Sequence, residues 1–88
     1  MAWPLSCASR MAERVGSSGT PARTAFGRRV RELRMARQMS QEELAERSGL
    51  HRTYISSLER GQRNVGLDNV HALARALSVH PGDLFRES

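Results

Sequence analysis

The segment SQEELAERSGLHRTYISSLERG, residues 40–61, determines the expected fold. Its first four residues form a capping box, in which the Ser40 hydroxyl accepts a hydrogen bond from the first turn and the Glu43 carboxylate reaches back to the cap. Gly49 can adopt the positive φ that a sharp turn requires. We therefore expect a short helix over 41–48, a tight turn, and a second helix over 52–60.

Small and apolar residues occupy the positions at which two such helices would touch. Ala45 is small enough to allow the helices to cross closely, and Leu50, Ile55 and Leu58 can hold the second helix against the first. Each position is weak evidence by itself, but all of them occur at the correct spacing behind a capping box. The spacing predicts a helix-turn-helix pair.

The outward face of helix 52–60 is unusual because its side chains are short and because it carries no Lys or Glu along its centre. On a wheel of about 100° per residue, Ile55 and Leu58 point inward. The opposite side carries short hydroxyls and one arginine, namely Thr53, Ser56, Ser57 and Arg60. A helix that enters the major groove of DNA needs little bulk and hydrogen-bonding groups at the base edges. This pattern predicts that the face contacts double-stranded DNA.

The rest of the chain supplies three further helical patterns. Phe26, Val30 and Leu33 form one apolar stripe in a helix from Thr24 to about Arg37. A later helix opens at Gly66 or Leu67, and PGDLF, with a proline at the first turn, predicts a short fifth helix. The later helix has its own apolar stripe of Val70, Leu73, Ala74 and Leu77. The expected fold is all-α, a compact five-helix domain over residues 24–88.

Residues 1–23 differ from this domain in composition. The segment VGSSGTPAR within them is rich in Gly, Ser and Pro, without hydrophobic periodicity, which is typical of a flexible tail. Met11 lies inside this tail, and the sequence leaves open whether it is the translational start.

Charge and cysteine content restrict the class of protein. The net charge is +5, all 14 basic residues are Arg, and the part from Thr24 onward has 11 Arg against 8 acidic residues, a net +3. This excess permits a polyanionic partner without requiring one. A single cysteine, Cys7, excludes an internal disulfide and favours a reducing cytoplasm. No apolar run approaches the roughly 18 residues of a membrane span, so we expect a cytoplasmic protein without a membrane partner.

Catalytic and metal-binding patterns are missing from the sequence. His51, His71 and His80 do not have metal-ligand spacing, and no nucleophile–base constellation or Gly-rich phosphate loop is discernible. We therefore expect no metal, no cofactor and no enzymatic activity, and no small-molecule ligand.

Residues 26–85 resemble the lambda-repressor-like domain of the XRE family of transcriptional regulators, which includes phage repressors and Cro. SQEELAERSGL is similar to that family's second helix and turn, and LSVHPGDLF is similar to the close of its fifth helix. HRTYISSLERGQRN is most similar to the controller proteins of restriction–modification systems. The resemblance implies a sequence-specific regulator that places helix 52–60 in the major groove of an operator.

The resemblance also implies roles for individual residues. The residues implied to read bases are Arg52, Thr53 and Ser56, with Ser57 and Tyr54 close by. Those implied to contact the DNA backbone are Gln41, Arg60, Arg63 and Asn64. Arg34 and Glu59 match an internal ion pair between the first helix and the recognition helix. Two departures from the family pattern are Gly66, where a Ser or Thr cap is common, and Ser78, where Gly is usual.

A homodimer is expected because one recognition helix covers too few base pairs to specify a unique genomic site. Two copies related by a twofold axis would bind a palindromic operator with half-sites about one helical turn apart. The expected interface is the apolar group near the C-terminal end of the domain: Leu77, Val79, Leu84 and Phe85.

One alternative function remains from the sequence. An antitoxin could use the same domain to regulate its own operon while it neutralises a toxin. Antitoxins usually need additional sequence to cover the toxin, and only the segment 1–23 is available here. This favours the stand-alone regulator.

Overall fold

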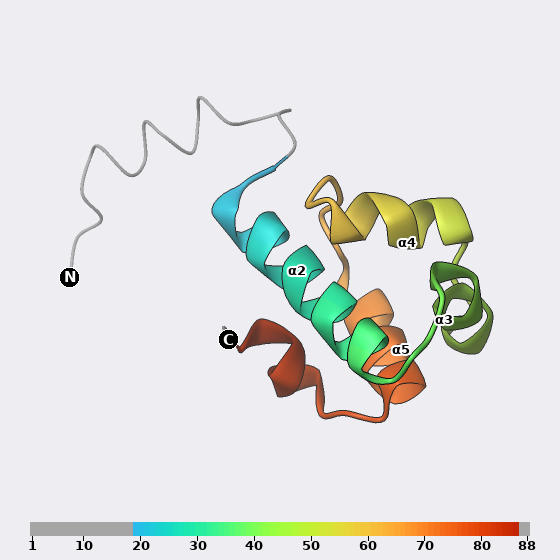
Figure 1. Cartoon of the computed structure of the whole chain (residues 1–88). Helices are drawn as coiled ribbons and strands as arrows, with labels where there is room; N and C mark the ends of the chain where they lie inside the picture. Colours follow the sequence, from blue (N-terminus) through green and yellow to red (C-terminus); the bar gives the residue numbers. More distant parts are fainter. Residues whose placement is uncertain (1–18, 87–88) are drawn as a thin grey trace, which may run out of the picture.

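The computed structural model describes residues 19–86, which form four α-helices and one 3₁₀ helix (Figure 1). In chain order these are α2 (Pro21–Ala36), α3 (Gln41–Ser48), α4 (Arg52–Glu59), α5 (Leu67–Leu77) and η1 (Pro81–Phe85). The all-α prediction is confirmed, but the fifth element is a 3₁₀ helix rather than an α-helix. Cys7, Met11 and most of the predicted tail lie outside the described residues.

Helix α2 begins at Pro21, earlier than the start expected at Thr24. Proline is favourable in a first turn because it lacks the N–H that would have no partner there. The Thr20 hydroxyl caps the helix by accepting a hydrogen bond from the Arg23 N–H at 3.3 Å. The first helix therefore includes residues that the sequence pattern assigned to the tail.

Both ends of α3 form largely as expected, the serine cap at its start and the glycine turn toward α4 at its end. The Ser40 hydroxyl accepts a hydrogen bond from the Glu43 N–H at 3.0 Å, and Gly49 has a φ of 77°. The Glu43 carboxylate does not complete the expected capping box. It accepts a hydrogen bond from Arg47 at 2.7 Å, because that guanidinium lies one turn away on the same exposed face.

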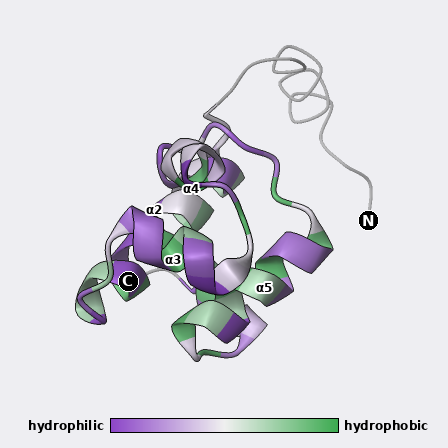
Figure 2. Ribbon diagram, turned by 90° about the vertical axis from the view of Figure 1, so that its right-hand side faces the viewer, coloured by the Kyte–Doolittle hydropathy of each residue, from purple (hydrophilic) through white to green (hydrophobic). Residues whose placement is uncertain are grey.

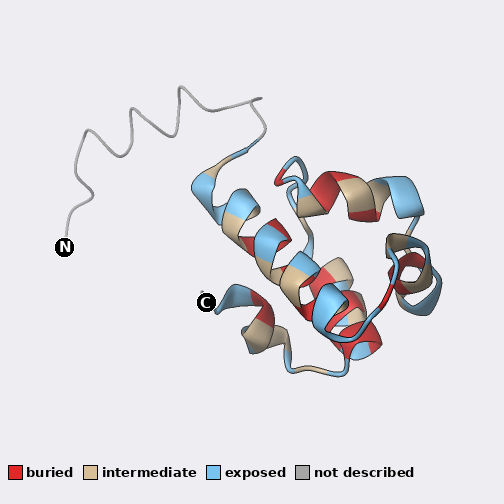
Figure 3. Cartoon of the chain, viewed as in Figure 1, coloured by how far each residue is buried: buried red, intermediate tan, exposed pale blue. Residues whose placement is uncertain are grey.

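The core is formed by all five elements, and each of them carries buried positions (Figure 3). The helices alternate between hydrophilic and hydrophobic segments along the chain, as amphipathic helices do (Figure 2). The largest fully buried side chains are Val30, Leu44, Ile55, Leu58, Leu73, Leu77 and Leu84.

This core corrects the expected dimer patch. Leu77 and Leu84 are fully buried within the single chain, because α5 and η1 pack against each other and against α2. They are therefore not available to a partner. Val79 is half-buried and Phe85 is 64% exposed, so the part of the patch at the surface is smaller than the sequence predicted.

Gly27 determines how closely α2 approaches the recognition helix. A Cβ atom at this position would overlap the Leu58 carbonyl oxygen and press on the Glu59 backbone. The absence of a side chain thus allows α2 to cross the C-terminal end of α4 in direct backbone contact. The sequence alone does not reveal this contact, because a glycine within a helix has several possible causes.

The 3₁₀ helix η1 is attached to α2 by a hydrogen bond from Arg29 Nε to the Asp83 carbonyl oxygen at 2.8 Å. The Asp83 carboxylate accepts a hydrogen bond from the His80 N–H at 3.2 Å and one from Arg86 at 3.4 Å. Desolvation acts to raise the pKa of Asp83, but these hydrogen bonds and the charge of Arg86 outweigh it and lower the pKa. Among residues 19–86, no helix is long and apolar enough to cross a membrane.

Candidate nucleic-acid interface

The N-terminal end of α4 presents the most accessible of the predicted base-reading residues. Arg52 and Thr53 are both exposed, and the Arg52 side chain retains 65% of its accessible surface. Arg52 Nε lies 3.8 Å from a carboxylate oxygen of Glu42, which is itself 77% exposed. Such an exposed pair is weak. The guanidinium is therefore free to leave Glu42 for another acceptor.

Ser57 does not belong to the outward face, which corrects the prediction from the helical wheel. It is buried, and its hydroxyl donates a hydrogen bond to the Thr53 carbonyl oxygen at 3.0 Å. At the C-terminal end of the helix the chain reverses direction at Gly61, and the Gln62 N–H donates to the Ser57 carbonyl oxygen at 3.0 Å. A wheel describes only the helix itself, and so it could not show that Ser57 is buried once the domain is packed.

Tyr54 lies on the flank of α4 and is held by two neighbours. Its hydroxyl accepts a hydrogen bond from Asn69 Nδ2 of α5 at 3.1 Å. The guanidinium carbon of Arg63 lies 5.6 Å from the centre of the Tyr54 ring, within the range of a cation–π contact. The sequence pattern predicts Tyr54 near the interface but gives no local signal for Asn69, which lies 15 residues away along the chain.

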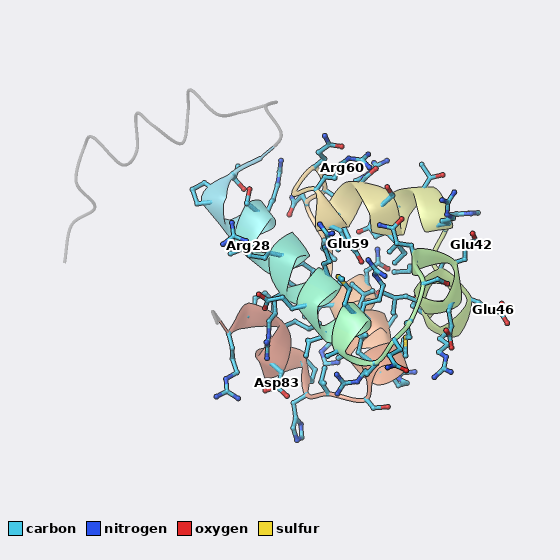
Figure 4. All side chains as sticks on the ribbon, in the orientation of Figure 1. Arg28, Glu42, Glu46, Glu59, Arg60 and Asp83 are labelled. Atoms are coloured by element: carbon cyan, nitrogen blue, oxygen red, sulfur yellow. The ribbon has the colours of Figure 1, made fainter. Side chains whose placement is uncertain are left out.

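The C-terminal end of α4 carries Arg60, which points away from the body of the domain (Figure 4). One of its terminal nitrogens donates to the Ser56 hydroxyl at 2.6 Å, and two other nitrogens approach the Gln62 side-chain oxygen at 3.3–3.4 Å. These partners are neutral, so they orient the guanidinium without cancelling its charge. Arg63 and Asn64 follow in the exposed loop.

Arg34 and Glu59 form an ion pair between α2 and α4 at the base of this face. Arg34 Nε and Nη2 donate to the two Glu59 carboxylate oxygens at 2.7 and 3.0 Å, while Arg34 Nη1 donates to the Met39 carbonyl oxygen at 2.7 Å. The side chains are 11% and 3% exposed. Gln41 Nε2 joins the network by donating to Glu59 at 3.1 Å, a contact that the sequence did not predict.

The resulting surface offers guanidinium groups, hydroxyls and an amide around one helix. Arg52, Arg60 and Arg63 supply positive charge along it, and Glu42 and Glu46 lie beside it on α3 (Figure 4). In the part of the chain that the structure describes, no group of three or more metal-ligating side chains comes together. Hydrogen-bond donors on a convex helix suit recognition of a polar surface better than chemistry on an enclosed substrate.

Known proteins share this architecture and its sequence. The family model described as helix-turn-helix matches residues 30–84. Control protein C.BamHI of Bacillus amyloliquefaciens is 54% identical over 63 residues, which are 70% of this chain and 78% of that protein. The residues aligned with C.BamHI include both helices of the helix-turn-helix pair, α3 and α4.

Two solved structures support the same relationship. The controller protein C.AhdI of Aeromonas hydrophila superposes with a TM-score of 0.71 at 54% identity, covering 72% of this chain and 96% of that one. C.Esp1396I bound to a 19 base pair DNA duplex superposes with a TM-score of 0.70 at 30% identity, covering 75% of this chain and 88% of that one. The relatives are named as control or controller proteins rather than enzymes, in agreement with the expectation of a non-enzymatic chain. The chain therefore belongs to the helix-turn-helix family, and within it to the XRE-type transcription regulators that include the restriction–modification controller proteins.

Proposed function

We propose that this protein binds a palindromic operator by placing α4 in the major groove of double-stranded DNA, and thereby controls transcription. The observation that carries the proposal is the low outward face of α4, with Arg52 and Thr53 exposed at its N-terminal end. The similarity to C.Esp1396I, which has been solved on a DNA duplex, supports the same mode of binding.

Base reading in this proposal belongs to Arg52, Thr53 and Ser56, with Tyr54 contributing from the flank. An exposed Arg at the start of a recognition helix can donate two hydrogen bonds to guanine O6 and N7. Arg52 suits this role because only an exposed carboxylate at 3.8 Å competes for it. Ser57 is excluded from the set, since its hydroxyl is already bonded to the backbone inside the domain.

The contacts with the DNA backbone are assigned to four residues, Gln41, Arg60, Arg63 and Asn64. Gln41 opens α3, and helix N-termini favour phosphate because of their unpaired N–H groups and dipole. Arg60, Arg63 and Asn64 are exposed immediately after the recognition helix, where the strand bordering the groove would pass. These contacts would fix the register of the protein on DNA without selecting a sequence.

A twofold dimer is part of the proposal, with a smaller interface than the sequence suggested. Phe85 is 64% exposed and borders a groove of about 480 Å³. Apolar residues form most of its lining, and Arg86 lies at it as well. Val79 is half-buried beside α5. A second copy that covered Phe85 would remove an aromatic surface from water and would supply the second recognition helix.

The stand-alone regulator is favoured over the antitoxin alternative. The relatives described above are control or controller proteins of restriction–modification systems. We therefore propose that the protein acts in that kind of system, where its own abundance sets the level of transcription.

The test is substitution of Arg52. The operator is first selected from a random duplex pool with the wild-type protein, and binding to it is then compared with binding to a scrambled duplex. Each bidentate base contact is worth about 1–3 kcal/mol of discrimination. Because Arg52→Ala removes one such contact from each half-site of the proposed dimer, it should reduce the ratio of the two affinities by at least roughly thirtyfold. Arg75→Ala removes an equal charge from an exposed position on α5 and should keep the ratio. An Arg52→Ala protein with the wild-type ratio would contradict the base-reading role.

A further inference from the structure

A polar notch lies where α2, α3 and α4 meet. Its volume is about 290 Å³. It is lined by side chains from all three helices, namely Arg31, Arg34, Gln41, Ser56, Glu59 and Arg60. Glu59 and Arg60, at the C-terminal end of α4, show its position in Figure 4.

Half of the lining is internally neutral. The Arg34 guanidinium and the Glu59 carboxylate cancel each other's charge at 2.7 Å, and Gln41 occupies part of the remaining capacity of the carboxylate. Because Arg34 also donates to the Met39 carbonyl oxygen, its donors are directed into the protein. These three side chains therefore line one side of the notch without a net charge.

The other two arginines leave the notch with an uncompensated charge of about +2. Arg60 contacts only the neutral Ser56 and Gln62 side chains. Arg31 is exposed, and its side chain has no hydrogen-bonding or ionic partner among residues 19–86. Two guanidinium groups from different helices beside one notch create a site for an anion with several oxygen acceptors.

The position of the notch indicates which anion this is. Arg31 lies one helical turn after Gly27, the point at which α2 touches the C-terminal end of α4. Gln41 places the N-terminus of α3 at the same notch, and that end of a helix also favours negative charge. If α4 lies in a major groove, the DNA strand that borders the groove passes beside α2, α3 and the C-terminal end of α4.

We propose that Arg31 binds a DNA backbone phosphate in this notch together with Arg60. Helix α2, which lies outside the helix-turn-helix pair, would then hold the recognition helix on DNA as well as supporting it inside the protein. The ligand is a phosphodiester, with one negative charge and two non-bridging oxygens. The inference rests on the proposed DNA binding, and it adds a contact that the helix-turn-helix pair itself does not contain.

The experiment measures the salt dependence of binding to a mixed-sequence duplex of about two helical turns, roughly 20 base pairs. Each phosphate contact contributes about 0.9 to the slope of log K against log salt. The proposed dimer has one such contact in each subunit, so Arg31→Ala should flatten the slope by about two units, weaken binding to every sequence alike, and leave the ratio of operator to mixed-sequence affinity unchanged. Its melting temperature should equal that of the wild type, because the Arg31 side chain stabilises nothing in the free protein.

Two further variants complete the design. Arg31→Lys keeps the charge and should keep most of the slope, while Arg75→Ala should retain both the slope and the affinity because it removes a charge from α5, away from the notch. If the wild type binds with a normal salt dependence and Arg31→Ala has the same slope, the phosphate role of Arg31 is overturned and the proposed function stands. A wild type that shows no salt-dependent binding to any duplex would overturn both.

Discussion

Glu59 carries a negative charge at a position that is almost removed from water. Its side chain is 3% exposed, and its two oxygens accept hydrogen bonds from Arg34 and Gln41. A buried carboxylate is tolerated only while such donors replace the lost hydration. The same carboxylate therefore joins α2, α3 and α4 through Arg34 and Gln41.

At this residue scale, removal of the Glu59 carboxylate should be costly. Glu59→Ala leaves the Arg34 guanidinium buried without its counter-charge, which costs about 3–5 kcal/mol for a buried pair. In a domain of this size, each kcal/mol lowers the melting temperature by roughly 4–8 °C. Thermal unfolding without DNA should therefore show a fall of more than about 10 °C.

Glu46→Ala is the matched control for this prediction. Glu46 is also a glutamate, but it is exposed on α3 and has no partner in the described part of the chain. Its removal should change the melting temperature by no more than the small amount typical of surface sites. If Glu59→Ala melted like Glu46→Ala, the Arg34–Glu59 pair would not contribute to stability as we propose.

Single residues also show where prediction from sequence ends. Ser56 and Ser57 are identical and adjacent, yet Ser56 accepts a hydrogen bond from Arg60 at the surface, whereas Ser57 is buried and donates to the Thr53 carbonyl oxygen. The helical wheel could place both outward because it uses angles around one axis only. Whether a small side chain is buried depends on how the other elements pack around it, and a local sequence pattern does not specify that packing.

The ends of the helices provide a comparison at the scale of elements. Helices α3 and α5 both end at a residue in the left-handed conformation, but α3 ends at Gly49 with a φ of 77° and α5 ends at Ser78 with a φ of 58°. A side chain disfavours this conformation because Cβ approaches the following carbonyl oxygen. Helix α5 therefore ends with backbone strain that α3 avoids.

Replacement of that serine should make the protein more stable. Ser78→Gly relieves the left-handed strain and should raise the free energy of unfolding by up to about 1 kcal/mol, after the greater chain entropy of glycine is included. Gly49→Ala should have the opposite sign and a similar size, because open space around its Cβ leaves backbone strain as the main effect. Urea unfolding of both variants measures the difference. A destabilised Ser78→Gly protein would show that the serine side chain stabilises the end of α5.

Elements were more predictable than residues, for a physical reason. The pair α3–α4 depends on local signals, a serine cap and a glycine turn at fixed spacing, and its bounds match the expectation closely. The extent of α2 depended on recognising Pro21 as a first-turn residue, and its close approach to α4 depends on Gly27, which makes a contact with a helix far along the sequence. Local patterns predict elements, whereas contacts between elements require the packed structure.

The surface of the whole domain depends on which apolar residues remain outside the core. The sequence shows that Leu77, Val79, Leu84 and Phe85 are apolar but does not show how η1 packs. In the structure η1 turns back onto α2, so that Leu84 enters the core and the Phe85 ring lies against Phe26 with centroids 5.3 Å apart. Of these four residues Phe85 alone is exposed, at 64%, which is the reason to place the dimer contact there.

The corresponding prediction is that Phe85 controls assembly. Sedimentation at micromolar concentration should show a dimer for the wild type and a monomer for Phe85→Asp, because a carboxylate cannot be buried against an apolar partner without a large desolvation cost. Leu67→Asp introduces the same charge at a residue that is 73% exposed at the start of α5, and it should remain dimeric. The monomeric variant should also bind the selected operator much more weakly, since one recognition helix reads only one half-site. A wild type that stays monomeric both free and on its operator would contradict the twofold arrangement, and the operator would then have to be read by a single recognition helix and its backbone contacts.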